Sequence, residues 1–427
     1  MAIHIKNGLV IDPRSSMYKQ ADILVDNGIL LDIGENLETP AGGQVIDAEG
    51  MWVAPGLIDL HVHFREPGFE YKENLATGAA SAAKGGFTTV CCMPNTNPVV
   101  DSEIILEFIK SKIRDLDINV LQIGAITKGQ LGKELANIGM MAEGGICAIS
   151  EDGKSVRNAG LLKTAMQYAS KFNLPVMSHC EDTDLVGPGL MNAGERAAYL
   201  GLAGISNDSE DIIVARDIML ADNAGSVHLH LCHISTEGSV RLLKEAKERG
   251  SKVTAEVTPH HFTLCDEDVT DYNTNYKMNP PLRSRRDVEI IRQALSQDII
   301  DCIATDHAPH HYDEKNCEFA SAANGIVGLE TAVPLAVTEL VRTGLISPLK
   351  LIEKMTYNPA KILGLGMGKG TLTKGGAADI TIIDPGCRYI IDTNSFLSKG
   401  KNSPFGGREV YGKVLCTICG GRVVYQC

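Results

Sequence analysis

About eight short apolar segments, separated by stretches with helical periodicity, constrain the fold of this chain most strongly. They are Gly56–His63, Phe87–Met93, Ile118–Gly124, Ile146–Ser150, Pro175–His179, Val227–His233, Val253–Thr258 and Ile300–Thr305. The segments between them include Glu103–Arg114, which Asp101 and Ser102 can cap, Glu210–Ala221 and Ser239–Arg249. Strands that alternate with helices build a parallel sheet, and eight such units close a (β/α)8 TIM barrel. The sequence therefore predicts an α/β fold of this type.

Both ends of the chain have the pattern of short strands joined by tight turns. Residues 1–53 contain Asn7-Gly8 and Asn27-Gly28, and residues 369–427 contain Gly420-Gly421, pairs that favour the positive φ of a two-residue hairpin. An isolated hairpin is only marginally stable, so we expect the two ends to form one small β domain. The 427 residues accommodate a barrel of about 250 residues, placed within residues 54–368, together with that domain.

Composition narrows the class of partner and the compartment. The 40 Lys and Arg residues against 53 Asp and Glu residues give a formal net charge of −13, which disfavours binding to nucleic acid. No apolar run of about 18 residues and no secretory leader pattern is present, so we expect no membrane association and a cytoplasmic location. The 12 cysteines are scattered and mostly lie in apolar runs, which suits reduced thiols.

Histidine and aspartate residues stand at the ends of several predicted strands, where a TIM barrel places its active site. His61 and His63 project to the same side of the first strand because side chains alternate along a strand. The same reasoning assigns His228 and His230 to the outer face, against the helices, and adds four residues to the inner group: Asp152, His179, His233 and Asp306. One such histidine is more often a buried core residue, but agreement among five strand ends favours a metal site. Four imidazoles and two carboxylates match the ligands of zinc, and they suffice for two ions if one carboxylate bridges.

Longer motifs around these residues carry a resemblance to a known family. They are Pro55–Gly68, Met93–Pro98, Ser178–Glu181, His233–Thr236, Lys277–Arg283 and Thr305–His310. In this order they resemble the amidohydrolase superfamily and, within it, the bacterial dihydroorotases. The resemblance spans nearly the whole chain, and it implies a (β/α)8 barrel with a small β domain made from both termini.

The resemblance also implies how a pair of zinc ions would be bound. One ion would be held by His61, His63 and Asp306, and the other by His179 and His233, with a bridging carboxylate between them. Many members of the superfamily use a carboxylated lysine as the bridge. This chain has Asp152 at that place, as one subgroup of dihydroorotases does, and Lys154 is the weaker candidate because of its loop position.

The activity implied is reversible, metal-dependent hydrolysis of the ring amide of (S)-dihydroorotate to N-carbamoyl-L-aspartate, a step of pyrimidine (UMP) biosynthesis. Metal ions would supply hydroxide near neutral pH and polarise the carbonyl. Asp306 is the expected catalytic residue, because a carboxylate there can carry a proton from the attacking hydroxide to the leaving nitrogen.

Substrate contacts are expected just beyond the ligands. Arg65 offers a planar fork for the substrate carboxylate, and Asn95 adds a donor. The resemblance adds Asn279 and His310. Similar enzymes often have Phe before Gly325, whereas this chain has Asn324, so we expect the Asn324-Gly325 pair to contact the substrate through its backbone.

Other interpretations stay open. A related cyclic amidase, allantoinase or dihydropyrimidinase, is disfavoured by Arg65, Asn95 and Asp152. A catalytically silent scaffold subunit is disfavoured because every expected ligand is present. We expect a homodimer that acts on a small molecule, a polar loop over the site at residues 311–324, a flexible connection at 364–370, and no metal at Cys416 and Cys419. His260 and His261 follow the seventh strand, and parity does not decide their direction.

Overall fold

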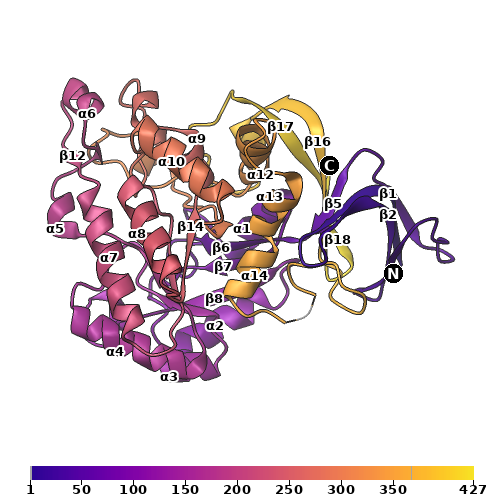
Figure 1. The fold of residues 1–427 in the computed structure, drawn as a ribbon, viewed down its shortest axis with the longest axis horizontal. Coiled ribbons are helices and arrows are strands. Elements are labelled where there is room, and N and C mark those ends of the chain that lie inside the picture. Colours follow the sequence, from indigo (N-terminus) through magenta and orange to yellow (C-terminus); the bar gives the residue numbers. More distant parts are fainter. Residues whose placement is uncertain (1, 367) are drawn as a thin grey trace.

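The computed structural model describes residues 2–366 and 368–427, which form a barrel beside a second sheet (Figure 1). Its barrel strands are, in order of pairing, β6 (Leu57–Val62), β7 (Phe87–Cys92), β8 (Asn119–Ala125), β9 (Ala148–Ser150), β10 (Val176–Ser178), β13 (Leu229–Leu231), β14 (Val253–Val257) and β15 (Cys302–Ile303). All neighbouring strands are parallel. A parallel bridge between Val62 and His307 links the end of the last strand segment to the first strand. The predicted (β/α)8 class is confirmed.

Helices follow the barrel strands, and many of them cover the outside of the barrel (Figure 1). They are α1 (Leu75–Lys84), α2 (Glu103–Ile113), α3 (Ile138–Glu143), α4 (Ala159–Ala169), α5 (Thr183–Val186), α6 (Glu195–Leu200), α7 (Asp208–Asp222), α8 (Glu237–Glu248), α9 (Pro259–Thr263), α10 (Arg285–Ser296), α11 (Tyr312–Lys315), α12 (Ala332–Ala336), α13 (Pro348–Met355) and α14 (Tyr357–Ile362). The predicted helices correspond to α2, α7 and α8. Ser102 is the N-cap of α2, but its side chain makes no capping hydrogen bond. Asp101 does not cap the helix either, and its carboxylate accepts a hydrogen bond from the backbone of Gly129, outside α2. None of the helices in the described ranges is long and apolar enough to cross a lipid bilayer.

Strands from both ends of the chain share the second sheet. Its order is β18 (Arg422–Gln426), β17 (Glu409–Cys419), β16 (Ile380–Ile390), β5 (Trp52–Pro55), β1 (Ile3–Asp12), β2 (Met17–Asp26) and β3 (Ile29–Gly34), with β4 (Gln44–Asp47) beside β1. The termini meet where β16 pairs antiparallel with β5. A further small parallel pair, β11 (Met191–Asn192) and β12 (Gly204–Ile205), lies between β10 and α7.

The turn predictions for this sheet are correct at two of the three positions. Asn27 and Gly28 have positive φ between β2 and β3, and Gly420 and Gly421 do so between β17 and β18. These two turns touch, because a Cβ added at Gly421 would lie 2.7 Å from the Cα of Gly28. The hairpin predicted at Asn7-Gly8 is wrong: Asn7 has a φ of 59°, but the register shift there is a bulge inside β1.

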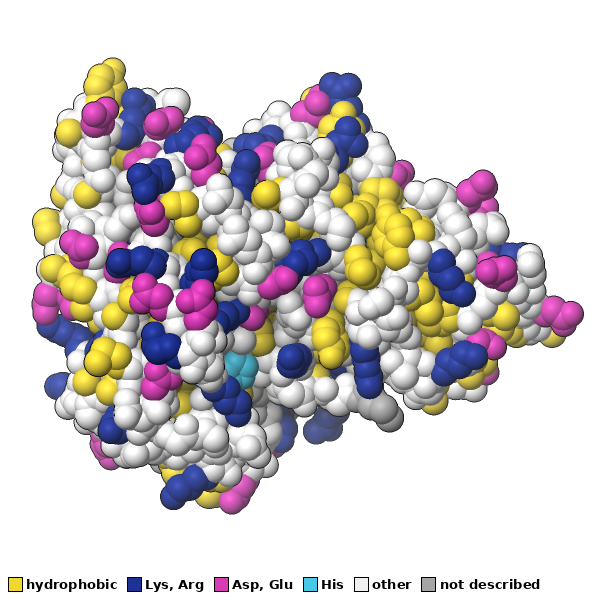
Figure 2. Space-filling view, in the orientation of Figure 1, with side chains coloured by type: hydrophobic (Ala, Val, Ile, Leu, Met, Phe, Trp, Pro, Cys, Tyr) yellow, Lys and Arg dark blue, Asp and Glu magenta, His cyan; other side chains and the backbone are white. Residues whose placement is uncertain are grey.

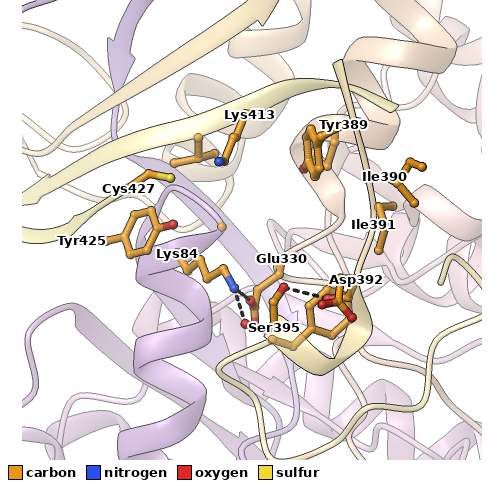
Figure 3. Close-up of a pocket in the computed structure, with 14 residues that line it drawn as sticks. Lys84, Glu330, Tyr389, Ile390, Ile391, Asp392, Ser395, Lys413, Tyr425 and Cys427 are labelled. Carbon is orange, nitrogen blue, oxygen red and sulfur yellow. Dashed lines mark hydrogen bonds and ion pairs between the residues drawn. The ribbon is translucent and has the colours of Figure 1, made fainter. Parts of the chain in front are cut away.

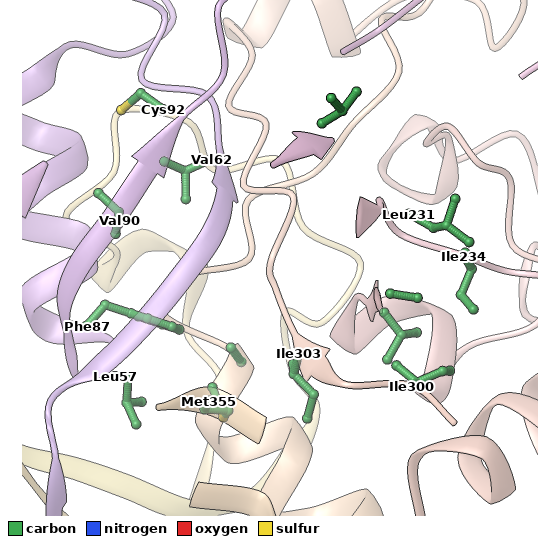
Figure 4. Close-up of a cluster of buried hydrophobic side chains, with 14 of the residues drawn as sticks. Leu57, Val62, Phe87, Val90, Cys92, Leu231, Ile234, Ile300, Ile303 and Met355 are labelled. Carbon is green, nitrogen blue, oxygen red and sulfur yellow. The ribbon is translucent and has the colours of Figure 1, made fainter. Parts of the chain in front are cut away.

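The main core lies between the barrel strands and the helices around them. Figure 4 shows Leu57 and Val62 of β6 beside Phe87 and Val90 of β7, with Ile300, Ile303 and Met355 toward the last strand. A separate cluster fills the barrel interior with residues from several strands, among them Ile58, Met177, Cys232, Cys302 and Ala304. On the face in Figure 2, basic and acidic side chains are interspersed over the barrel helices, and hydrophobic side chains gather where the barrel meets the terminal sheet.

Two predicted loops can be located. The glycine-rich segment 364–370 follows α14 and leads toward β16, and Met367 lies outside the described residues. Residues 311–324 contain the short helix α11, which the absence of periodicity did not predict. Cys416 and Cys419 both lie in β17, as the sequence predicts, and all twelve cysteines, each within the described part of the chain, are free thiols.

Candidate metal centre and active site

A buried aspartate is the centre of the group of predicted ligands. Asp152 follows β9 and is 4% exposed, and its Oδ1 lies 3.2 Å from His61 Nε2. Its Oδ2 lies 3.4 Å from His63 Nε2. The same Oδ1 also lies 3.7 Å from His179 Nδ1 and 3.8 Å from His233 Nε2. One carboxylate thus faces all four imidazoles.

The chemistry of the donor set around Asp152 fits metal binding. Two groups of potential ligands share this residue: His61, His63 and Asp152 form one, and Asp152, His179 and His233 form the other. Two atoms of these groups, His61 Nε2 and Asp152 Oδ1, are buried without a hydrogen-bond partner. A buried polar atom without a partner is costly, and a bound cation would satisfy these atoms.

Asp306 joins the first of these groups. Its Oδ1 lies 3.1 Å from His63 Nε2 and 3.5 Å from His61 Nε2. Burial raises the pKa of Asp306, but the two imidazoles outweigh burial and leave the pKa below its ordinary value. A carboxylate held ionised beside the ligands is able to accept a proton.

Three predicted site residues have a backbone that non-glycine residues rarely adopt. Arg65, His233 and Asp306 have φ values of 63°, 31° and 47°. Because β13 ends at Leu231 and β15 at Ile303, the side chains of His233 and Asp306 are directed by this left-handed backbone and not by strand alternation. Uncommon backbone conformations of this kind concentrate at functional sites.

The predicted orientations of His228 and His230 are wrong. Leu229 and Leu231 pack in the cluster that includes the helical residues Val214 and Leu243, so they face outward. His230 alternates with them and points into the barrel, where its Nε2 lies 3.1 Å from Glu256 Oε2. His233 reaches the site only because the strand ends before it.

Glu256 of β14 supports the first imidazole of the group. It is fully buried, and its Oε1 lies 2.7 Å from His61 Nδ1. Burial raises the pKa of Glu256, but His61 and His230 outweigh burial and hold it at about 2. An ionised carboxylate here accepts the Nδ1 proton of His61 and leaves Nε2 free as a ligand. Sequence reasoning missed this residue, although its alternation with Ala255 and Val257 in a predicted strand was a usable signal.

The interior hydrogen bonds continue from Glu256 away from the site. His230 Nδ1 lies 2.8 Å from Thr254 Oγ1, which lies 2.8 Å from His228 Nε2. Each side chain thus has a partner inside the barrel, which explains how these polar groups are accommodated there. His260 and His261 instead lie in α9, and His261 Nε2 bonds the carbonyl of Pro280 at 3.0 Å.

A cavity of about 160 Å³ opens above these ligands. Its lining contains every predicted metal ligand except His61, together with five predicted substrate contacts: Arg65, Asn95, Asn279, Asn324 and Gly325. Asn95 Nδ2 donates to Asp152 Oδ2 at 3.2 Å, and Asn279 Nδ2 donates to Glu181 Oε1 at 2.8 Å. The structure therefore brings these side chains around one space.

His310 lies behind the wall of this cavity. Its Nε2 lies 2.8 Å from the carbonyl oxygen of Asn324 and 3.5 Å from Arg65 Nη2. Burial and then the charge of Arg65 lower the pKa of His310 to about 3, so the imidazole is neutral. Since a carbonyl only accepts, Nε2 donates its proton to Asn324, and the side chain supports the 323–325 turn while packing beside Arg65.

Lys154 is directed elsewhere. Its Nζ donates to the carbonyl of Gln130 at 3.2 Å, whereas Asp152 occupies the middle of the imidazole group. Asp152, and not Lys154, therefore lies among the imidazoles.

A larger cavity of about 290 Å³ lies between α1 and the strands β16 to β18 (Figure 3). Lys84 forms an ion pair there with Glu330 at 2.9 Å, and Tyr389, Lys413 and Tyr425 line the wall. It contains none of the predicted site residues, so volume alone does not locate the site.

Comparison with known proteins assigns the family. The family model described as "Dihydro-orotase-like" matches residues 50–239. A dihydroorotase from Acetivibrio thermocellus is 51% identical over 99% of this chain and 98% of its own, and one from Trichlorobacter lovleyi is 49% identical over 100% of both. Among solved structures, an L-hydantoinase (dihydropyrimidinase) from Arthrobacter aurescens has a TM-score of 0.90 at 27% identity, covering 99% of this chain and 96% of that one. The chain therefore belongs to the dihydroorotase family and is a cyclic amide hydrolase.

Proposed function

We propose that this protein catalyses the reversible hydrolysis of the ring amide of (S)-dihydroorotate to N-carbamoyl-L-aspartate. The observation that carries the proposal is the position of Arg65 in the cavity that contains the Asp152-centred group. Dihydroorotate has a carboxylate beside its ring amide, whereas hydantoins and dihydropyrimidines without that group leave the half-buried guanidinium of Arg65 without an anionic partner. The missing charge-assisted hydrogen bond disfavours the interpretation of this protein as a related cyclic amidase.

The ligands proposed for two zinc ions are His61, His63 and Asp306 for one and His179 and His233 for the other, with Asp152 between them. When bound, such ions lower the pKa of water and polarise a carbonyl. The carboxylate of Asp306 accepts the proton of the attacking water and returns it to the ring nitrogen as the amide bond breaks. In ring closure the carboxylate of Asp306 takes the proton from the attacking nitrogen.

The remaining polar groups bind and orient the substrate. Arg65 pairs with the substrate carboxylate, and Asn95, Asn279 and the backbone of Asn324 and Gly325 face the ring from the cavity wall. His310 acts beside them by donating to the carbonyl of Asn324. Restricting the ring in this way lowers the entropic part of the barrier.

The wider context is proposed from the same activity. The reaction places the protein in pyrimidine biosynthesis in the cytoplasm, where free thiols such as those of this chain stay reduced. A homodimer stays a prediction, which sedimentation would test.

The decisive experiment measures cyclisation of N-carbamoyl-L-aspartate and the metal content of the same sample. We expect turnover with about two zinc ions per chain. A zinc-loaded protein that ignores this substrate but opens an uncharged ring amide would instead be a hydantoinase-like enzyme. Intact mass under non-denaturing conditions tests the bridge, since a carbamate on Lys154 would contradict the role of Asp152.

A further inference from the structure

One buried lysine connects two parts of the cavity wall. Lys315 is the last residue of α11 and is 6% exposed. Its Nζ donates to three carbonyl oxygens: Lys277 at 3.1 Å, Ala323 at 2.8 Å and Gly325 at 3.1 Å. No carboxylate within the described ranges forms an ion pair with it. An ammonium has three donors, so its hydrogen bonds are used up by this backbone.

The bonded carbonyls belong to segments that line the cavity. Gly325 lines it directly, and Lys277 stands two residues before Asn279, which lines it from the opposite segment. The amide of Gly325 also donates to the carbonyl of Lys277 at 3.1 Å. Lys315 thus crosses the junction at which these two segments meet.

The turn itself has little freedom to move without changing these contacts. Gly325 has a φ of 120°, and a Cβ there would lie 2.6 Å from the Cβ of Ala308. Asn402, from the C-terminal part of the chain, donates to the carbonyls of Gly325 and Ala308, each at 3.1 Å. Loss of the ammonium would leave three buried carbonyl bonds unmade on one side of this turn.

We propose that Lys315 is a positioning residue that holds the 323–325 turn against the 277–279 segment and thereby sets substrate affinity. This inference rests on the proposed function of the cavity, but not on the identity of the metal. Lys315 does not contact the reacting atoms. Its effect falls on KM, because substrate and transition state share the same wall.

The ammonium is sensitive to pH in the working range. Burial and the neighbouring Lys277 lower the pKa of Lys315 to about 7, and Cys317 opposes them. Other charged or titratable groups around the adjacent cavity are Tyr71, Lys72, His310, His311, Tyr312, Lys399 and Lys401. As pH rises above about 7, the neutral amine keeps two donors and turns a lone pair toward a carbonyl. KM should therefore rise from pH 6.5 to pH 9.

The test compares Lys315→Met and Lys315→Arg with a matched control, Lys354→Met. Lys354 is also fully buried, but it bonds Asp298 and the carbonyl of Ile300 before β15, at the end of that strand opposite to the site. We expect Lys315→Met to raise KM for dihydroorotate about 10-fold at pH 6.5 with kcat within threefold, the loss of about one charge-assisted hydrogen bond. Lys315→Arg stays charged and should keep a low KM that no longer rises toward pH 9.

Hydrogen exchange of the Gly325 amide gives a readout that does not depend on activity. We expect faster exchange in Lys315→Met than in the wild type, and wild-type exchange in Lys354→Met. Unchanged exchange and a KM within twofold of the wild type, in a folded Lys315→Met protein, would overturn the proposal. An equal rise of KM in Lys354→Met would also overturn it, because it would indicate general destabilisation. Absence of wild-type turnover would instead contradict the proposed function, and exchange would still decide the role of Lys315.

Discussion

Replacing Glu256 by Gln tests whether the barrel interior prepares His61 as a metal ligand. Glu256 is fully buried and bonds His61 Nδ1 at 2.7 Å and His230 Nε2 at 3.1 Å. Gln has the same shape, and its amide can still accept from His61 and donate to His230, so the fold should persist. What is lost is the negative charge that strengthens His61 as a donor to metal.

Changing a group that hydrogen-bonds a metal-binding imidazole costs about 10- to 100-fold in metal affinity, or about 1.4 to 2.8 kcal/mol. We expect a loss in this range for the ion at His61 and His63, measured by competition with a zinc-binding dye. Glu73→Gln is the control, because Glu73 is also a fully buried carboxylate but bonds Ser398 and Thr77. Its nearest imidazole, His307 at 3.8 Å, is not one of the four around Asp152. Wild-type zinc affinity in Glu256→Gln, or an equal loss in Glu73→Gln, would refute the reasoning.

Three further outcomes follow. Arg65→Met should raise KM for dihydroorotate by about 10- to 150-fold, because charge-assisted hydrogen bonds to the substrate carboxylate are lost. Any slow opening of uncharged dihydrouracil should be unaffected. Steady-state kinetics on both substrates checks this, and equal losses on both would exclude a carboxylate contact. Asp306→Asn should abolish turnover in both directions, since Asn cannot carry a proton; appreciable activity in either direction would eliminate the proposed relay. Phe87→Ala, at a fully buried core position between barrel and helices, should lower the free energy of unfolding by about 3 to 5 kcal/mol in urea titrations, and a loss under 1 kcal/mol would contradict tight packing there.

Local patterns were sufficient for the architecture of the barrel. Each predicted strand segment coincides with a barrel strand, although β8 extends one residue beyond its predicted segment and the last strand is reduced to Cys302–Ile303. Hydrophobic periodicity depends only on residues that are close in the sequence, so it can be recognised without knowing the contacts between distant residues. The turns at Asn27-Gly28 and Gly420-Gly421 were likewise predictable, because positive φ is a local preference of Asn and Gly.

The position of the candidate site was also accessible from sequence, because parallel strands of a barrel end on one face. The direction of a side chain beyond the end of a strand could not be predicted from the sequence. His233 and Asp306 were placed correctly by an alternation that no longer applies to them, and the same alternation misplaced His228 and His230. A residue in the left-handed region interrupts the extended backbone, so the alternation of the preceding strand does not continue past it.

The sequence by itself determined the order of strands and helices, the class of the fold and the residue types that meet at the barrel mouth. Only the tertiary structure decided which groups support them. Glu256 behind His61 and Lys315 behind Gly325 depend on partners far along the chain. Such pairings leave no local periodicity, because they are fixed by the closure of the barrel and by where its long loops pack.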